Sequence, residues 1–399
     1  MIKTALTFLV IYFSLLIASD LNKDNLRDLK PSPKKIPVTF DAHGVKRVDN
    51  YYWMRDDTRK DQEVIDHLNS ENAYLEGWFA SGLDERDKLF QEITDRIPKK
   101  EDSVPIRLKN YEYFRRYEPE NEHAIYIRRK NKNSEEIVLL DVNELAHGKD
   151  FYQLANWSIS PSESLMAYAE DINGRRQYSI KFKDLIKSET YDYVIENTSG
   201  DMAWSAEGDY LFYVLRDEET LLPHKVFRHK VGTSQDTDEL VYEEKDTTFY
   251  LSVGNTRSME FIELSISSTT SSETRLIKSN NPTSSPEIFY KREKDHLYSV
   301  DHDPASDRFL IESNWNATNF RLLEVNLIDS KVKENWKEII PHREAVLLQA
   351  VIPFPKHLVV MERENGLKKL RILDKESLNS RTVDSVSYTH LTLPTTYHV

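Results

Sequence analysis

Residues 205–217 read SAEGDYLFYVLRD, in which a serine and a polar turn lead into a strand of tyrosine, leucine, phenylalanine and valine. The same order of residue types recurs at a constant spacing of 47 residues, starting at Ser158, Ser205, Ser252 and Ser299. In each unit a polar turn then leads to a second apolar strand. These regularities predict a repeat protein whose units open on a turn-rich stretch followed by two strands.

The predicted strands align from unit to unit. The first strands fall at residues 165–168, 210–213, 259–262 and 308–311, and the second at residues 178–182, 225–228, 274–277, 321–325 and 369–373. One period further in each direction, the pattern returns at Tyr111 and Val346. Counted from Tyr111, the chain is predicted to hold five units and a partial sixth.

A period of about 40 to 50 residues built from short strands is typical of the four-stranded blade of a β-propeller. Helical repeats of similar length are disfavoured, because the apolar runs are short, rich in β-branched and aromatic residues, and interrupted by turns such as Asn173-Gly174. A chance recurrence of serines is the alternative, and the matching strands argue against it. We therefore predict a mainly β fold built around a β-propeller.

A helical segment is predicted before the repeats. Apolar residues recur at three- and four-residue steps through residues 61–79 and indicate an amphipathic helix. A second helix is predicted for residues 83–97, because Pro98 cannot continue it. The predicted domains are thus an extended and helical segment at 20–98 and a truncated propeller at 99–385.

The two ends of the chain differ from the rest. Residues 1–19 combine Lys3, an apolar core and small residues before Asp20, so they are predicted to be a signal peptide and the protein to be exported, periplasmic or extracellular. An uncleaved anchor is the alternative, although the apolar run is shorter than the about 20 residues of a spanning helix.

Residues 386–399 have no acidic residue and do not fit the repeat. They are predicted to be a non-native tail, the alternative being a genuine threonine-rich end.

Charge and composition exclude several partners. The 399 residues carry a formal net charge of -13, which argues against nucleic acid, because phosphate binding needs a concentrated basic surface. The absence of cysteine removes disulfides, thiolate metal sites and cysteine nucleophiles. The 12 histidines lack His-x3-His spacing and the acidic runs do not form a calcium loop, so we predict no metal and no cofactor. Stable membrane insertion after signal cleavage is not expected.

Motifs along the chain resemble one family. The first are IP at 36–37, HG at 43–44, RVDNYYWMRDD at 47–57 and ENAY at 71–74. They continue as EITDRIP at 92–98, YEP at 117–119, AED at 169–171, RRQY at 175–178, TLLP at 220–223, YEEKD at 242–246 and REKDH at 292–296. Together they cover residues 36–375 and resemble oligopeptidase B, the trypsin-like branch of the prolyl oligopeptidase family of serine peptidases.

The resemblance implies a serine endopeptidase that cuts short peptides after arginine or lysine. In that family a seven-bladed propeller caps an α/β-hydrolase catalytic domain and acts as a size filter that admits peptides and excludes folded proteins. The N-terminal helical segment, here residues 36–98, wraps back onto the catalytic domain. A peptide substrate, reached through the catalytic domain, is therefore the expected partner.

This sequence departs from the family at its end. A nucleophile elbow of the Gly-x-Ser-x-Gly type needs small residues around an exposed serine, and none of the 10 glycines flanks a serine in that way. We therefore predict no catalytic residue in this chain, no activity of the chain alone, and a propeller that lacks one or two blades. An open ring leaves blade faces exposed and predicts aggregation.

Two pairs of residues are candidates for a role. The resemblance places Arg175 and Arg176 where propeller and catalytic domain meet, with interdomain salt bridges that gate substrate entry as the hypothesis. A solvated hairpin turn is the alternative, because surface ion pairs are individually weak. His43 and Asp49 are interpreted as structural, the former as a hydrogen-bonded histidine beside Gly44 and the latter as fixing the following turn.

Two other functions remain open. A non-catalytic propeller scaffold could bind peptides or proteins, and it should then close its ring and bury its N-terminal aromatic residues without help. A propeller enzyme with chemistry in the central channel, as in glycan-processing enzymes, would need convergent carboxylates near the axis. The sequence gives no spacing that indicates such carboxylates.

Overall fold

The computed structural model describes residues 30–383. Within it the chain forms two compact units: one runs to Glu101 and includes Glu118–Glu120, and the other comprises Asp102–Tyr117 and the chain from Asn121 onward. The predicted signal peptide at 1–19 and the predicted tail at 386–399 lie outside the described residues.

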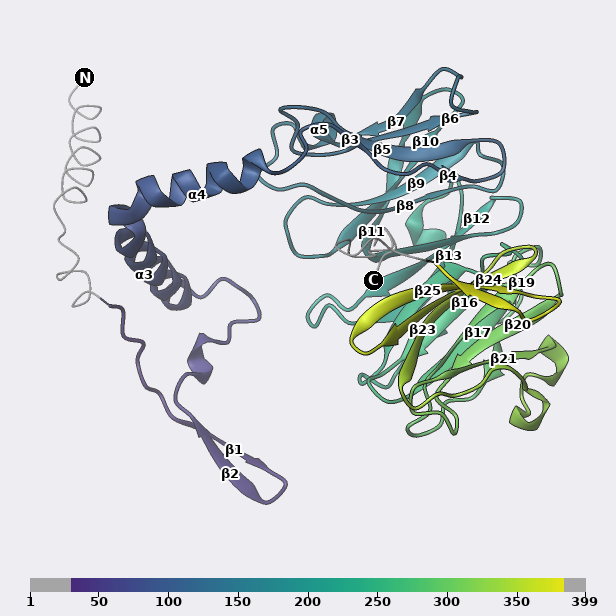
Figure 1. Ribbon diagram of the computed structural model, residues 1–399. Helices are drawn as coiled ribbons and strands as arrows, with labels where there is room; N and C mark the ends of the chain where they lie inside the picture. The colour runs from purple at the N-terminus through teal and green to yellow at the C-terminus, as the bar shows by residue number, and fades with distance from the viewer. Residues whose placement is uncertain (1–29, 384–399) are drawn as a thin grey trace, which may run out of the picture. The chain divides into compact units, whose positions relative to one another are not determined.

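The first unit is a hairpin followed by two helices (Figure 1). Its elements are β1 (Val38–Ala42), β2 (Val45–Asp49), η1 (Tyr52–Met54), α3 (Gln62–Phe79), η2 (Ala80–Gly82) and α4 (Leu83–Asp95). Asp61 caps α3 by accepting a hydrogen bond from the Glu63 N–H. Both predicted helices are confirmed, and α4 ends before Ile97, because the residue preceding a proline disfavours helical dihedrals.

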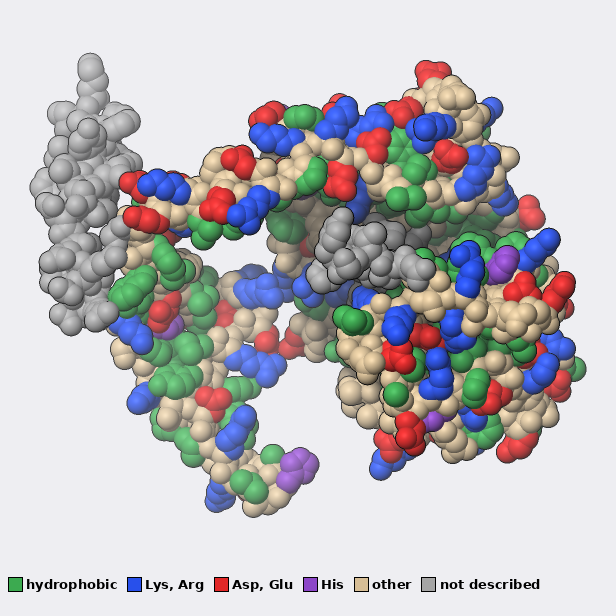
Figure 2. Space-filling view, viewed as in Figure 1, with side chains coloured by type: hydrophobic (Ala, Val, Ile, Leu, Met, Phe, Trp, Pro, Cys, Tyr) green, Lys and Arg blue, Asp and Glu red, His purple; other side chains and the backbone are tan. Residues whose placement is uncertain are grey.

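The helices of this unit keep most of their apolar side chains in solvent. Within α3 and α4, Val64 alone is buried among the described side chains. Green side chains follow both helices in Figure 2. The exposed ones are Leu68, Leu75, Trp78, Phe79, Leu83, Leu89, Phe90 and Ile93. The two helices therefore carry more apolar surface than the first unit buries within itself.

The second unit is a series of antiparallel sheets (Figure 1). Within the described residues these are six blade-like units. Blade 1 contains β3 (Glu101–Asp102), β4 (Ile106–Arg107), β5 (Glu112–Tyr117), β6 (Ile125–Arg129) and β7 (Ile137–Asp141). Blade 2 contains β8 (Gln153–Ile159), β9 (Leu165–Asp171), β10 (Tyr178–Asp184) and the first part of β11 (Glu189–Trp204). Blade 3 contains the rest of β11, β12 (Tyr210–Arg216), β13 (Pro223–Lys230) and β14 (Glu239–Glu243).

The remaining blades each have four strands. Blade 4 contains β15 (Tyr250–Asn255), β16 (Phe261–Ser267), β17 (Ser272–Lys278) and β18 (Glu287–Tyr290). Blade 5 contains β19 (Tyr298–Asp303), β20 (Arg308–Ser313), β21 (Arg321–Val325) and β22 (Lys337–Ile340). Blade 6 contains β23 (Val346–Pro353), β24 (His357–Glu364), β25 (Leu367–Asp374) and β26 (Ser380–Thr382). Short helices occur at α5 (Val142–Ala146), η3 (Gln235–Thr237), η4 (Leu327–Asp329) and η5 (Lys333–Asn335).

Strand β11 links blades 2 and 3 without a break. Its first part pairs with β10 and its last part with β12, so the two blades form one seven-stranded sheet. The strand changes partners at a bulge containing Gly200. Its φ is +87°, a backbone conformation that glycine adopts with little strain because it has no Cβ. A side chain there would also start 3.1 Å from the ring of Tyr178.

The hydrophobic core lies between the blades. Five clusters of buried side chains each join one blade to the next, from blades 1 and 2 to blades 5 and 6. Strand β12 shows how this arises from alternation: Leu211 and Tyr213 pack towards blade 2, and Phe212 and Val214 towards blade 4. Nearly continuous apolar runs are therefore needed in the central strands, because both of their faces are covered.

The predicted mainly β propeller fold is confirmed, but the phase of the repeat was wrong. The two strands predicted per unit are the second and third strands of each blade. Ser158, Ser252 and Ser299 lie within the first strands, and Ser205 directly follows β11. The sixth unit is not partial, since β23 to β26 form a four-stranded sheet.

Candidate functional site

One end of the blades gathers the candidate residues. Because consecutive strands are antiparallel neighbours, the first strand of a blade begins at the end where its second strand finishes. We call this end the start face. It holds the turns between second and third strands, such as β5–β6 and β9–β10, and the connections from one blade to the next.

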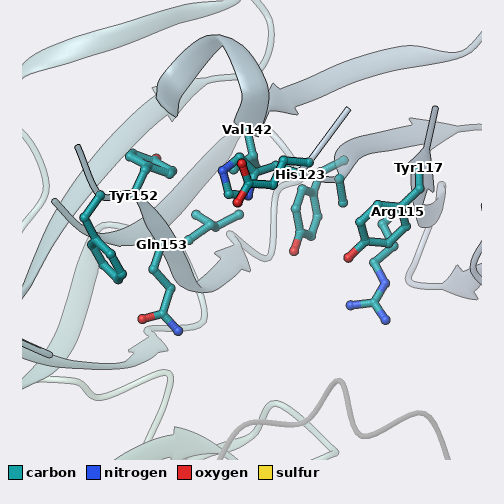
Figure 3. A pocket seen from close by; sticks show the side chains of 11 residues that line it. Arg115, Tyr117, His123, Val142, Tyr152 and Gln153 are labelled. Atoms are coloured by element: carbon teal, nitrogen blue, oxygen red, sulfur yellow. The ribbon is translucent and has the colours of Figure 1, made fainter. Parts of the chain in front are cut away.

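A pocket of about 560 Å³ opens on the start face at the boundary of blades 1 and 2 (Figure 3). Strand β5 contributes Arg115 and Tyr117, β6 contributes Tyr126, and the start of β8 contributes Gln153 and Leu154. The other lining residues are Glu122, His123, Ala124, Val142, Phe151 and Tyr152. Figure 3 shows Arg115 and Gln153 on opposite sides of the pocket, with their polar ends extending in the same direction.

Hydrogen bonds hold the walls of the pocket in place. The amide of Asn143 bonds both backbone groups of His123, at 2.9 and 3.0 Å. The phenol of Tyr152 donates to Glu170 at 2.8 Å. Burial, followed by this carboxylate, raises the pKa of Tyr152, so the phenol remains a donor across the physiological pH range.

Arg115 gives the pocket a positive group. Its backbone is fixed by hydrogen bonds with Ser103, while within residues 30–383 no carboxylate lies at ion-pair distance from its guanidinium. The guanidinium carbon lies 6.0 Å from the ring centroid of Tyr117. Burial raises the pKa of Tyr126, and the positive charge of Arg115 opposes that shift.

Arg175 and Arg176 lie on the same face, in the turn between β9 and β10. The Asp171 carboxylate builds this turn by accepting hydrogen bonds from the N–H groups of Asn173, Gly174 and Arg176, the last at 2.7 Å. Arg176 is exposed at a φ of +57°, and Arg175 is partly buried. In the described part of the chain neither guanidinium has an ion pair, and the buried Nε of Arg175 has no hydrogen-bond partner.

The arginine turn adjoins the pocket. A Cβ at Gly174 would lie 3.8 Å from the ring of Phe151, which is a lining residue. The structure thus brings together the predicted Arg175 and Arg176 and a pocket that the sequence interpretation missed. The available signal was the YEP motif at 117–119, which borders the pocket at Tyr117.

His43 and Asp49 belong to the N-terminal hairpin. Asp49 Oδ1 accepts a hydrogen bond of 2.9 Å from the Tyr51 N–H and so fixes the turn, as interpreted from the sequence. His43 was interpreted as hydrogen-bonded, but its side chain is exposed and has no hydrogen bond to any described residue. It occupies the hairpin turn with Gly44, where both residues have positive φ, as a two-residue hairpin turn of type I′ requires.

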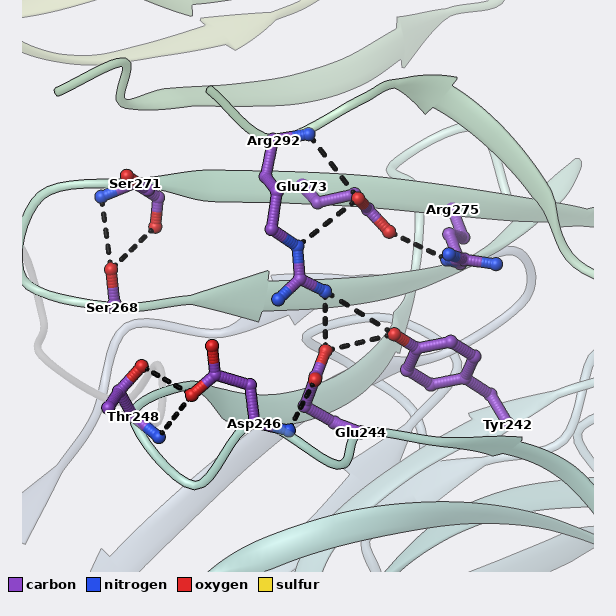
Figure 4. A network of polar contacts seen from close by, with 9 residues as sticks. All are labelled: Tyr242, Glu244, Asp246, Thr248, Ser268, Ser271, Glu273, Arg275 and Arg292. Atoms are coloured by element: carbon purple, nitrogen blue, oxygen red, sulfur yellow. Dashed lines mark hydrogen bonds and ion pairs between the residues drawn. The ribbon is translucent and has the colours of Figure 1, made fainter. Parts of the chain in front are cut away.

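Two motifs of the sequence meet at the junction of blades 3 and 4 (Figure 4). Arg292 bonds Glu244 at 2.5 Å and Glu273 at 3.3 Å, and its guanidinium lies 4.1 Å from the ring centroid of Phe249. Burial disfavours ionisation of Glu244, but hydrogen bonds from Arg292, the Asp246 N–H and Tyr242 outweigh burial and lower its pKa. These motif residues therefore hold two blades together.

The buried His296 does not form a catalytic arrangement with the serine beside it. His296 Nε2 lies 2.9 Å from Ser313 Oγ, but both residues are buried and Nδ1 of His296 has no partner among the described residues. Burial and, to a smaller extent, the positive charge of Lys333 lower the pKa of His296 to about 4. A serine nucleophile needs an accessible hydroxyl and a histidine oriented by an acid, and this pair offers neither.

One group of side chains could surround a cation. Glu260, His302 and Asp307 place one ligand atom each within 4.8 Å of one another. His302 is buried, however, and its Nδ1 has no hydrogen-bond partner in residues 30–383. A metal on Nε2 would leave a buried Nδ1–H without an acceptor, whereas metal-bound histidines normally donate that proton. We therefore assign no metal to this group.

The sequence matches a known domain. Residues 30–397 match the family model described as "Prolyl oligopeptidase, N-terminal beta-propeller domain". The chain belongs to the prolyl oligopeptidase family. The matched range extends into the stretch at 386–399.

Relatives and solved structures agree with this family. The chain is 38% identical over 360 residues to "Dipeptidyl aminopeptidase BI" of Pseudoxanthomonas mexicana, covering 85% of this chain and 49% of the relative. It is 33% identical to "Protease 2" of Moraxella lacunata, covering 90% of this chain and 52% of the relative. The oligopeptidase B structure from Leishmania major superposes with a TM-score of 0.83 at 27% identity, covering 89% of this chain and 53% of that one.

The prolyl oligopeptidase relatives are longer than this chain. It spans about half of the length of the curated relatives above. The family resemblance inferred from the motifs is confirmed, as is a propeller domain of a peptidase family. None of the helices within residues 30–383 is long and apolar enough to cross a membrane.

Proposed function

We propose that this chain is the propeller part of an exported serine endopeptidase that cleaves short peptides after arginine or lysine. The observation that carries the proposal is the match of residues 30–397 to the propeller domain of prolyl oligopeptidases, together with relatives of which it spans about half. The nucleophile, base and acid would come from an α/β-hydrolase domain outside this chain, because the 10 glycines form no elbow.

In this proposal the propeller limits access to the catalytic residues by substrate size. Its start face is suited to meet a catalytic domain, because the chain enters the first blade there and the fourth strand of every blade ends there. Arg175 and Arg176 lie on this face without ion pairs in the described chain and would pair with carboxylates of that domain. The exposed apolar side chains of α3 and α4 would pack against it as well.

The first test is to sequence the source DNA or transcript beyond the codon for Ser385. The proposal expects the reading frame to continue into a Gly-x-Ser-x-Gly elbow. Expression of that longer protein should then give hydrolysis of fluorogenic peptides with arginine or lysine before the scissile bond, and little hydrolysis of matched peptides with alanine there. A confirmed stop codon after Val399, with a soluble chain that binds peptides, would favour the scaffold function instead.

Size selection needs its own measurement. Peptides of increasing length with one arginine should be cleaved at rates that fall sharply above a threshold, and folded proteins should resist cleavage. Equal rates for short peptides and for a denatured protein would contradict the size filter while leaving the peptidase assignment intact.

A further inference from the structure

The pocket on the start face has the chemistry of an anion site. Arg115 is its cationic group, and no carboxylate of the described chain, the lining residue Glu122 included, lies at ion-pair distance from the guanidinium. A partly buried guanidinium without a counter-ion favours binding of an external anion, because its five N–H donors lack charged acceptors. Hydrogen bonds with Ser103 fix the backbone of Arg115 in the wall of the pocket, from which its side chain can reach such a ligand.

The surroundings select a particular anion. Tyr117, Tyr126 and Phe151 give the pocket aromatic walls, and the amide of Gln153 offers both a donor and an acceptor. Glu122 adds one negative charge at an exposed position, which disfavours a doubly charged phosphate more than a singly charged carboxylate. A planar carboxylate is also the group that a guanidinium binds through two parallel hydrogen bonds.

The pocket is formed before any ligand arrives. Asn143 anchors the loop at His123, and Tyr152 is held by Glu170, which in turn pairs with Lys181 at 2.6 Å. Little ordering of these wall residues is then required on binding, and preorganisation of this kind strengthens affinity. Aromatic and amide groups around one charge are suited to a peptide end or an acidic side chain rather than to an inorganic ion.

We propose that this pocket binds a carboxylate group of a peptide, with Arg115 as the residue that recognises it. The assignment of the ligand as a peptide rests on the proposed peptidase function, because the pocket opens on the face that would meet the catalytic domain. The carboxylate belongs either to the C-terminus of the peptide or to an aspartate or glutamate within it. A substrate held there is kept on the propeller while its basic residue is cleaved elsewhere.

The test is direct binding to the full chain by calorimetry. The first pair of probes is an N-acetylated hexapeptide without acidic side chains, with either a free C-terminal carboxylate or a C-terminal amide. The second pair is the amidated peptide with one internal glutamate or glutamine. Recognition of the C-terminus predicts at least a tenfold loss of affinity on amidation, and recognition of a side chain predicts the same loss from glutamate to glutamine.

Variants connect the binding to Arg115. Arg115→Gln should weaken the preferred probe at least tenfold, and Arg115→Lys should weaken it less, because the charge remains but the two-pronged geometry is lost. Arg257→Gln is the matched control, since this arginine also lies over an aromatic ring, Phe354 at 5.9 Å, but lines no part of the pocket. Urea unfolding of every variant shows whether the fold is intact.

Equal binding of acid and amide probes in both pairs, equal binding by Arg115→Gln and the original chain, or no peptide binding at all would overturn the proposal. None of these results affects the proposed peptidase function, which is measured as hydrolysis by the longer protein. If the chain alone does not stay soluble, the same variants in the longer protein provide the readout. Arg115→Gln should then raise KM for the carboxylate peptide with kcat unchanged, and leave KM for the neutral peptide unchanged.

Discussion

The blades and the N-terminal helices contain similar apolar residues but bury them to different extents. Trp204 in β11 is 0% exposed, whereas Phe90 in α4 is 66% exposed. The blades achieve burial because each lies between neighbours, so alternating side chains find cover on both faces. The helices have apolar stripes that their own unit leaves open. A repeat thus supplies its own partners, while a helical segment of this kind needs one from elsewhere.

The largest expected effect tests this difference in burial between the blades and the N-terminal helices. Trp204→Ala should destabilise the blades by about 3–5 kcal/mol, because it removes a fully buried ring and leaves a cavity. Phe90→Ala should change the free energy of unfolding by less than about 0.5 kcal/mol, because its ring is already in water. Urea unfolding monitored by circular dichroism gives both values. Similar losses for both variants would mean that α4 is packed in solution.

The junction of blades 3 and 4 provides the second effect. Arg292→Ala leaves the buried carboxylate of Glu244 without its main partner, removes one of the two arginines that pair with Glu273, and should cost about 2–3 kcal/mol. Lys369→Ala is the control, because its pair with Glu364 is exposed and should contribute less than about 1 kcal/mol. If Glu244→Gln in the Arg292→Ala background does not recover part of the loss, unpaired charge is not the cause.

Opposite pH dependences should separate the two regions further. Burial, reinforced by Asp301, raises the pKa of Glu263 to about 8, and burial raises that of Glu312 to about 7. These two carboxyl groups therefore bind more protons in the folded blades than in the unfolded chain between about pH 4.5 and 8, and their contribution to stability falls as pH rises through this window. Glu263→Gln should reduce this fall in urea unfolding at pH 5, 7 and 9.

The turn before α3 should respond in the other direction. Hydrogen bonds from Thr58 and from the backbone N–H groups of Asp61 and Lys60 lower the pKa of Asp56 to about 2. Their contribution is present above the unfolded value of 3.8 and is lost as pH falls towards 2. Hydrogen exchange of the amides of Thr58 and Asp61 at pH 5 and pH 3 reports this change. Faster opening at pH 5 than at pH 3 would contradict it.

The smallest effect is local to the first unit. Asp61→Ala removes the side-chain cap of α3 and should weaken its first turn by about 1 kcal/mol. Faster hydrogen exchange at Glu63 should accompany an unchanged unfolding midpoint of the blades. Asp61→Asn is the control, because asparagine caps a helix about as well. A shifted blade midpoint would show that the two regions unfold together.

The repeat was predictable where the strands are apolar on both faces. Strands such as β12, with LFYV at residues 211–214, can be recognised in the sequence by a continuous apolar run. First strands are harder to recognise, because β15 contains Gly254 and Asn255 and is less apolar. Fourth strands are short, β26 having only three residues. The phase of the blade was misjudged for this reason.

The candidate site was less predictable than the fold. Arg175 and Arg176 were predicted from a sequence motif, whereas Arg115 and Gln153 come from different blades and share no local pattern. Whether an arginine has a counter-ion depends on strands brought together by folding. Arg116, the residue next to Arg115, pairs with Asp102 and Glu136 on the other face of the same strand. No sequence pattern distinguishes the paired arginine from the one that faces the pocket.

Strand β11 has a mechanical consequence. A ring of blades flexes where its sheets slide against each other, since packed side chains yield more easily than a ladder of hydrogen bonds. Blades 2 and 3 are joined by one continuous backbone strand of 16 residues in addition to the side-chain packing between them, although the ladder is interrupted at the bulge between Thr198 and Met202. These two blades, which carry the arginine turn, are therefore expected to separate less readily than blades that side-chain packing alone holds together.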